Sequence, residues 1–247
     1  MTHFHESRRP RQPFLLAPWP VLLLIGVLVV CYVAFALAPV RLENRIVADY
    51  AFIPARYASQ AFFAAYGMGP GGVLERALPF LTYIFIHATP GHLAINSIWL
   101  LPFGSVVARR YHAVSFFVFF LLCGAAGAAA HLAFNWGSTL PVVGASGAIS
   151  GLMGAAFRMM GPPQAVSEGQ GPVRPPLAPL FSRRIMVWSA VWVGVNIVAG
   201  VLGLGGGTEV RLIAWQAHLG GYFAGLLLAG PFAALAGRVE PDGPRLR

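Results

Sequence analysis

A serine and a histidine stand in polar interruptions of an otherwise apolar sequence, and together they have the chemistry of a nucleophile and its base. Ser146 lies in the segment Gly-Ala-Ser-Gly at 144–147, and His218 lies in Ala-His-Leu-Gly-Gly at 217–221. A serine hydroxyl attacks a carbonyl carbon effectively only when a base takes its proton, and histidine has a pKa suited to that transfer. Nucleophilic and ionisable side chains are costly inside a membrane, so we interpret this pair first as functional.

A second histidine and an asparagine are spaced to share one face of a helix. His92 and Asn96 are four positions apart, which is about one helical turn. Like Ser146 and His218, this pair follows closely on the start of an apolar segment, so we expect all of them at a similar depth. A tetrahedral intermediate needs donors at its oxyanion. The side chains of His92 and Asn96, together with the free backbone N–H groups of a helix that starts at Ser146, are suited to that role.

The carboxylates are placed unfavourably for a catalytic triad. Asp49 and Asp242 are the only aspartates, and every glutamate lies outside the predicted spans. The sequence therefore predicts a Ser–His dyad and excludes an aspartyl intramembrane protease. A zinc site from His87, His92 and His218 is disfavoured, because the chain has no His-Glu-x-x-His motif. We expect neither a metal nor a cofactor, and we interpret His87, at a loop–helix boundary, as an interfacial residue close to the site.

Glycines near both residues predict close approach of two helices. Gly147 and Gly151 repeat at a spacing of four, as do Gly221 and Gly225, and Gly144 precedes the serine. Small residues at this spacing let helix backbones come together in membranes. A hydrogen bond between Ser146 and His218 demands such an approach.

The composition indicates a polytopic, all-α membrane protein. Of 247 residues, 57% are hydrophobic and 10% charged, against about 25% charged in an ordinary soluble domain. A spanning helix needs about 20 apolar residues. Six segments are predicted to span, the fourth of them short, and their approximate bounds are Trp19–Ala38, Gly91–Val107, Ala113–Phe134, Ser146–Met160, Ile185–Leu204 and Arg211–Ala236.

The net charge of +9 is distributed in a way that predicts orientation. All 17 basic residues are arginines, and those flanking the predicted spans alternate between a rich and a poor side. The rich side holds Arg8, Arg9, Arg11, Arg109, Arg110, Arg158, Arg174, Arg183, Arg184, Arg238, Arg245 and Arg247, and the poor side holds Arg41, Arg45, Arg56, Arg76 and Arg211. By the positive-inside rule, both termini are cytoplasmic. Nucleic acid is disfavoured as a partner because no basic block contains interleaved aromatics.

The domain organisation follows from these spans. We expect a basic cytoplasmic tail at 1–18, one six-helix membrane domain at 19–237 and a second cytoplasmic tail at 238–247. The long outer loop at 41–90 has the aromatic composition of a segment in the membrane interface. Residues 136–143 include glycine and proline and are predicted to be irregular.

At these residues the chain resembles the rhomboid family of intramembrane serine proteases. His-x-x-x-Asn at 92–96, Gly-x-Ser-Gly at 144–147 and Ala-His-x-x-Gly-x-x-x-Gly at 217–225 occur in the family's order and on its helices. The similarity covers about residues 41–236. Each motif alone has an ordinary helix-packing explanation, but three in order favour the family. The resemblance implies Ser146 as nucleophile, His218 as general base, and His92, Asn96 and the Ser146 N–H at the oxyanion.

The resemblance also implies a bacterial-type protease of the inner membrane that cleaves transmembrane protein substrates within or beside the lipid bilayer. This sequence departs from the family pattern at three places. No Trp-Arg pair can be placed in the first loop, a glutamate common after the second span's glycine is absent from 104–108, and Ser150 stands where an aromatic often packs on the base.

Two other classes of function were weighed. A catalytically inactive relative would bind membrane clients without cutting them, and the presence of both Ser146 and His218 argues against it. A transporter would contain paired broken helices in two repeated halves. Only one irregular segment of that kind, 136–143, is visible in the sequence.

Overall fold

A computed structural model describes residues 17–58, 61–65, 72–161, 176–202 and 214–238. In that part of the chain the regular secondary structure is helical, apart from one isolated β-bridge between Phe52 and Val142. The predicted all-α class is therefore confirmed. The predicted tails at 1–18 and 238–247 lie almost entirely outside the described residues, as do residues 162–175 between the fourth and fifth predicted spans.

One long helix comes first, a group of shorter helices follows it, and the remaining helices complete the chain. Helix α1 spans Trp19–Ala36 and is followed by the first-loop helices α2 to α6 and a 3-10 turn, η1. Their bounds are Val40–Tyr50 for α2, Ala55–Ala58 for α3, Ala61–Ala65 for α4, Val73–Ala77 for α5, Pro79–Thr82 for α6 and Tyr83–Phe85 for η1. The remaining helices are α7 (Pro90–Ala108), α8 (Ala113–Phe134), α9 (Ser146–Met159), α10 (Arg183–Leu202) and α11 (Trp215–Arg238).

Among the described residues, five helices are long and apolar enough to cross a membrane: α1, α7, α8, α10 and α11. The fourth predicted span, Ser146–Met160, corresponds to α9, which has 14 residues and extends about 21 Å at 1.5 Å per residue. It can be shorter than the hydrocarbon layer because other helices surround it. Helix α9 packs against α7, α8 and α11, and most of its residues are buried.

The predicted boundaries agree with the helices to within two residues, except at the start of the last one. The sequence predicted a helix from Arg211, but Ala214 is not helical and α11 begins at Trp215; residues 211–213 lie outside the described part. The carbonyl of Ala214 accepts hydrogen bonds from the N–H groups of Ala217 (2.8 Å) and His218 (3.3 Å), which starts the helix there. His218 consequently lies in the first turn of α11.

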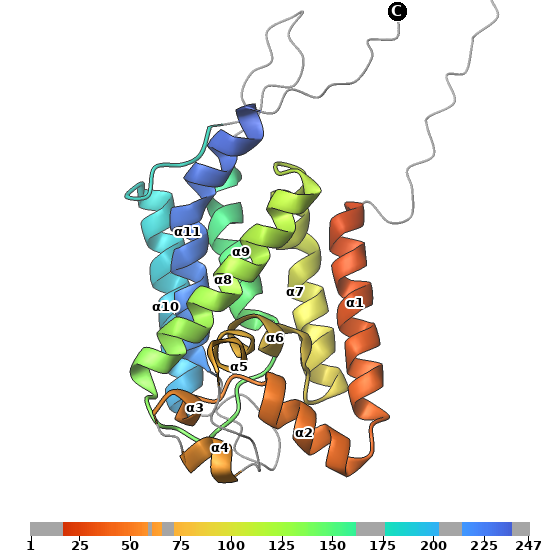
Figure 1. Cartoon of the computed structure of the whole chain (residues 1–247). Coiled ribbons are helices and arrows are strands. Elements are labelled where there is room, and N and C mark those ends of the chain that lie inside the picture. The colour runs from red at the N-terminus through yellow and green to blue at the C-terminus, as the bar shows by residue number, and fades with distance from the viewer. Residues whose placement is uncertain (1–16, 59–60, 66–71, 162–175, 203–213, 239–247) are drawn as a thin grey trace, which may run out of the picture.

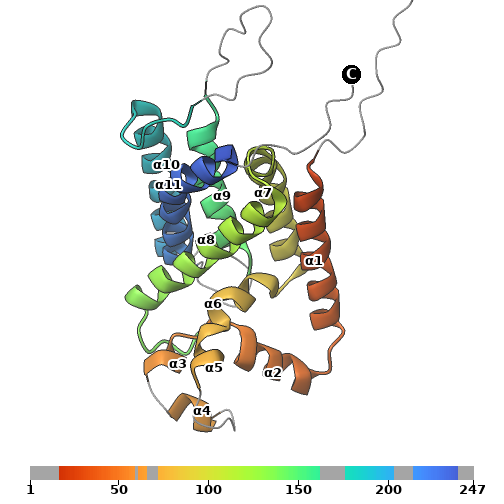
Figure 2. The ribbon, with the colours of Figure 1, turned by 45° about the horizontal axis from the view of Figure 1, so that its top comes forward.

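The helices form a bundle with α9 inside it (Figure 1). Helices α1 and α10 lie on opposite outer sides, while α2 to α6 gather at the end where α9 begins (Figures 1 and 2). The start of α1 and the end of α11 both lie at the other end of the bundle (Figure 1).

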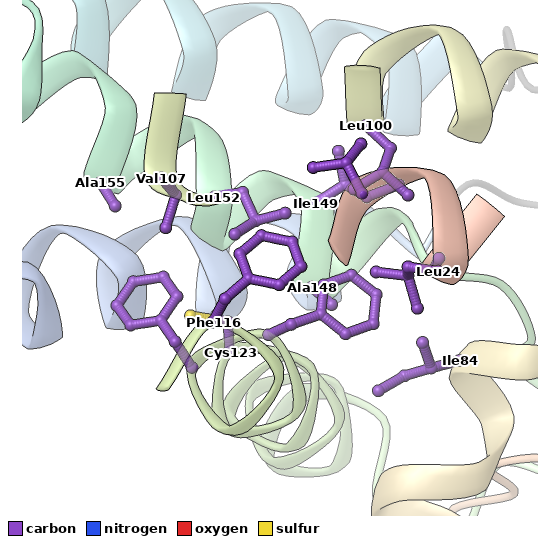
Figure 3. Close-up of a cluster of buried hydrophobic side chains, with 14 of the residues drawn as sticks. Leu24, Ile84, Leu100, Val107, Phe116, Cys123, Ala148, Ile149, Leu152 and Ala155 are labelled. Carbon is purple, nitrogen blue, oxygen red and sulfur yellow. The ribbon is translucent and has the colours of Figure 1, made fainter. Parts of the chain in front are cut away.

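The main hydrophobic core lies between α1, α7, α8 and α9. Side chains from these helices and from η1 interdigitate there (Figure 3), among them Leu24, Ile84, Leu100, Phe116 and Leu152, all at most 4% exposed. Large apolar side chains on the outer helices are instead exposed, such as Val30 of α1 (68%) and Val201 of α10 (75%). Apolar surface on this scale suits contact with lipid tails, as expected for an integral membrane protein.

A buried arginine anchors the first loop. Arg56 of α3 is 1% exposed, donates to the backbone carbonyls of Ala48 and Glu75, and lies over the ring of Phe62 at 5.1 Å from its centroid. The neighbouring hydroxyl of Tyr57 donates to the carbonyl of Arg76 at 2.8 Å. The loop is thus fixed by an Arg-Tyr pair, although the sequence carries no Trp-Arg pair there.

Candidate active site

A glycine turn delivers Ser146 to the start of α9. Gly144 has φ +110°, a backbone conformation in which an L side chain is strained. Its N–H donates to the carbonyl of Tyr83 at 2.9 Å, and the preceding loop is pinned by the bridge from Phe52 to Val142. These bonds fix where the helix starts, and Ser146 is its first residue.

The start of α9 offers unpaired backbone donors. Its first regular backbone bond runs from the N–H of Ile149 to the carbonyl of Ala145 at 2.9 Å, and no side chain caps the helix. The N–H groups of the first turn, including that of Ser146, therefore lack helical partners and point outward from the helix end. The helix dipole adds a partial positive charge at this position.

Glycines bring α9 and α11 into backbone contact. A Cβ atom at Gly221 would overlap the carbonyl of Gly147, and one at Gly225 would overlap the carbonyl of Gly151. The two helices can lie this close only because neither position carries a side chain.

This approach places the serine and histidine side chains in hydrogen-bond contact. The distance between Ser146 Oγ and His218 Nε2 is 2.8 Å. Both side chains are half-buried. The contact has the geometry in which an imidazole nitrogen takes the proton of a serine hydroxyl.

The other ring nitrogen of His218 has a partner that sequence reasoning missed. His218 Nδ1 lies 2.7 Å from Oδ1 of Asn196, on α10. Among the described residues, the carboxylates are Glu43, Asp49 and Glu75, all of the first loop. The group that contacts His218 Nδ1 is therefore an amide and not a carboxylate. The sequence shows that Asn196 is an amide among the apolar residues of a span, which could have marked it as a candidate. The sequence does not show which helix the Asn196 side chain faces.

His92 and Asn96 lie beside the turn that precedes Ser146. Thr89 Oγ1 accepts from the N–H of His92 at 3.1 Å and caps α7. A Cβ atom at Gly144 would lie 2.6 Å from Nε2 of His92 and 3.7 Å from Nδ2 of Asn96, so both side chains reach the serine's turn. One N–H of the Asn96 amide donates to the carbonyl of His92 at 3.0 Å, and the amide carries a second N–H that this bond does not use.

His87 is buried, so its interpretation as an interfacial residue was wrong. Its side chain is fully buried, and its ring centroid lies 5.1 Å from that of His92. The adjacent Ile86 belongs to a buried cluster with Ala51, Ile53, Ala55 and Phe62 of the same outer loop. Burial first, and His92 second, lower the pKa of His87 to about 4, so it is neutral at physiological pH. The zinc alternative gains no support, because both ring nitrogens of His218 contact Ser146 and Asn196.

Ser150 faces its own helix. Its hydroxyl donates to the carbonyl of Ser146 at 2.7 Å, and the side chain is 3% exposed. A small side chain bonded to its own backbone supplies no aromatic surface to the histidine ring.

Comparison with known proteins is consistent with this geometry. Residues 74–234 match the Rhomboid domain family, which is more than half of the chain. The chain is also similar to Rhomboid protease GluP of Bacillus subtilis (strain 168), with 33% identity over 157 residues. That alignment covers 63% of this chain and 25% of the relative, so the chain spans about a quarter of the relative's length.

Proposed function

Because this chain belongs to the rhomboid family, we propose that it is a serine endopeptidase that cleaves peptide bonds in or near transmembrane segments of other membrane proteins. Its similarity to a rhomboid protease supports intramembrane protease activity. The observation that carries the proposal for this chain is the 2.8 Å contact between Ser146 Oγ and His218 Nε2.

In the proposed reaction, His218 Nε2 takes the proton of the Ser146 hydroxyl as Oγ bonds to the substrate's carbonyl carbon. The tetrahedral intermediate collapses when the peptide C–N bond breaks, and His218 gives its proton to the departing amine. A water molecule then attacks the acyl-enzyme, with His218 again taking and returning a proton. The products are two peptide ends and the free serine.

The proposed oxyanion site lies at the start of α9. The absence of a side-chain cap supports an oxyanion role for the Ser146 N–H and the helix dipole. The closeness of His92 and Asn96 to Gly144, two residues before the proposed nucleophile, supports the same role for their side chains. Such donors stabilise charge that develops only in the transition state.

The proposed substrates are transmembrane proteins with helix-destabilising residues near the outer face of the bilayer. An intact helix encloses its carbonyls in i to i−4 hydrogen bonds, so a segment must unwind before a serine can reach one. We further propose one membrane protease domain at 19–237, in a bacterial inner membrane, with cytoplasmic tails at 1–18 and 238–247. Neither a metal nor a cofactor takes part in the proposed steps.

The test is cleavage of a transmembrane reporter by the purified protein in detergent. Ser146→Ala and His218→Ala should each abolish cleavage and keep the wild-type melting temperature, and the double variant should be no slower than either single one. Ser189→Ala on α10 is the matched control and should retain activity. Equal cleavage by wild type and Ser146→Ala would exclude the serine mechanism. An inactive wild type that still binds the reporter would favour the client-binding alternative.

A further inference from the structure

Asn196 is a buried amide on α10, which is the least buried of the five helices long enough to span a membrane in the described part of the chain. Only 11% of the apolar stretch of α10 is buried, yet Asn196 is 4% exposed. Its amide makes two contacts: Nδ2 donates to the carbonyl of Trp192 at 2.9 Å, and Oδ1 lies 2.7 Å from Nδ1 of His218. Burying an amide in a span is favourable only when its hydrogen bonds are made, so both contacts constrain its orientation.

The Trp192 contact decides which end of the amide faces the histidine. A backbone carbonyl can only accept, so the amide's NH₂ group must face it and Oδ1 must face the ring. The reversed orientation would place two acceptor oxygens together at Trp192. The amide oxygen therefore lies against Nδ1 for a reason independent of the histidine.

This orientation determines the tautomer of the ring. An amide oxygen only accepts, so the hydrogen of the neutral imidazole must lie on Nδ1, and Nε2 must carry the lone pair. Nε2 is the atom that lies 2.8 Å from Ser146 Oγ. The tautomer fixed by Asn196 is thus the one that can receive the serine's proton. In the other tautomer, Nε2 would already carry a hydrogen and could not act as a base.

We propose that Asn196 is the positioning residue for the base of this protein, holding His218 in the Nδ1–H tautomer and aiming Nε2 at Ser146. The inference rests on the proposed protease function. The same bond persists when His218 becomes an imidazolium, since Nδ1 keeps its hydrogen, so Asn196 neither gains nor loses a proton. Asn196 restrains the His218 ring from α10. Ser150 of α9 does not restrain the ring, because its hydroxyl donates to the carbonyl of Ser146.

The helix pair supplies a matched control. Ser189 Oγ and the Tyr222 hydroxyl lie 2.9 Å apart and form another polar contact between α10 and α11, away from His218. If Asn196 served only to attach α10, then Ser189→Ala and Asn196→Leu would have comparable effects. Leucine is close in size to asparagine but has no acceptor.

The kinetic test compares Asn196→Leu, Asn196→Asp and Ser189→Ala in reporter cleavage. Asn196→Leu should lower kcat by about 10- to 100-fold, the range expected for a misaligned catalytic group, with KM within about twofold. Asn196→Asp keeps an acceptor oxygen for Nδ1, and because a carboxyl buried in a span is favoured in its protonated form, its O–H can replace the N–H that donates to the Trp192 carbonyl. This variant should therefore lose much less, and Ser189→Ala should keep kcat. Equal losses in the leucine and aspartate variants, or a leucine variant as active as Ser189→Ala, would overturn the proposal.

A spectroscopic test is independent of turnover. Nitrogen NMR of protein labelled with ¹⁵N-histidine distinguishes protonated from bare ring nitrogens, and the His218 signals are those lost in His218→Ala. The wild type should show protonated Nδ1 and bare Nε2, and Asn196→Leu should show a mixture of tautomers. A wild type with the hydrogen on Nε2, or an unchanged pattern in Asn196→Leu, would refute the positioning role. Failure of Ser146→Ala to stop cleavage would instead refute the protease proposal, whatever the tautomer.

Discussion

Gly144 shows how one residue joins the geometry of the backbone to the candidate chemistry. Its φ of +110° turns the chain into α9, and a Cβ atom there would lie 2.6 Å from Cε1 and Nε2 of His92. The sequence predicted this glycine as a packing residue near the site. The structure adds that its neighbour is the ring of His92, so the absence of a side chain lets α7 approach the turn that precedes Ser146.

Single residues differed in how far their role could be predicted. Ser146 and His218 could be identified as candidates because a serine and a histidine within apolar segments suggest a functional role rather than ordinary packing. Asn196 was not identified, because one neutral amide also serves ordinary packing between helices. Its contact depends on the rotation of α10 against α11, which local sequence does not specify. Arg56 was assigned to the outer loop, and only tertiary structure shows that it is buried.

At the oxyanion, we predict that Asn96→Ala and His92→Ala each slow cleavage without preventing acylation by a reactive probe. Losing one such donor typically lowers a rate by about 10²–10³. Slow labelling of Ser146 by a fluorophosphonate should remain, because Ser146 and His218 keep their 2.8 Å contact. Loss of labelling together with a lower melting temperature would make the two residues structural instead.

The burial of His87 predicts a pH dependence of stability. Its folded pKa of about 4 lies below the ordinary value of 6.5, so the unfolded chain takes up the proton more readily. Its contribution to stability is full above about pH 6.5 and falls as the pH drops toward 4, by at most about 1.4 kcal/mol per pH unit. His87→Phe should therefore flatten the acid fall in melting temperature, whereas His112→Phe, at an exposed position, should not. Parallel curves for His87→Phe and wild type would contradict this.

At the scale of elements, the predicted spans agreed well because apolar length determines them. The start of α11 did not, because residues 212–214 are apolar and continue the hydropathy of the helix. Hydropathy cannot locate a helix start that backbone bonds to Ala214 define. Hydropathy also does not explain why α9 can be short. Its sequence is apolar enough to lie in a membrane, but its burial among α7, α8 and α11 makes a full-length span unnecessary.

The contact between α9 and α11 predicts that Gly221→Val abolishes activity. A Cβ atom there would overlap the Gly147 carbonyl, and the two helices must separate to admit it. A displacement of about 1 Å can lower a rate by 10²-fold, so cleavage should be lost even if the bundle still forms. Gly194→Val on α10 is the control, because a Cβ atom at Gly194 meets nothing within 4 Å. Equal losses in the two variants would indicate general packing damage rather than separation of Ser146 from His218.

At the scale of the whole molecule, the connectivity makes α9 a crossing element despite its length. Helix α8 ends near the first-loop helices, and α10 begins at the opposite end of the bundle (Figure 1). Helix α9 makes the connection between these ends, so the start of α1 and the end of α11 fall on the same side. The two helix ends next to the predicted tails therefore lie at one end of the bundle.

Which side is cytoplasmic depends on charge, and much of that charge lies outside the described residues. Among the arginines whose side chains the structure describes, five lie at the end opposite the site and four lie at the end of the site. This difference is small. The larger bias comes from arginines in the tails and in the loop at 162–175. The sequence thus predicts an orientation that the bundle alone does not determine.

Thiol labelling tests this orientation, and two exposed positions suit it better than sites in the undescribed loops. Val73 of α5 is 88% exposed near the site, and Phe181, just before α10, is 87% exposed at the other end. With Cys31→Ala as background and the buried Cys123 retained, Val73→Cys should react with an impermeant maleimide on intact bacterial spheroplasts. Phe181→Cys should react only after the membrane is permeabilised. Both should react in detergent, which controls for intrinsic reactivity. The opposite pattern would place Ser146 at the cytoplasmic face, and the proposed substrates would then have to present their unwound segment from that side.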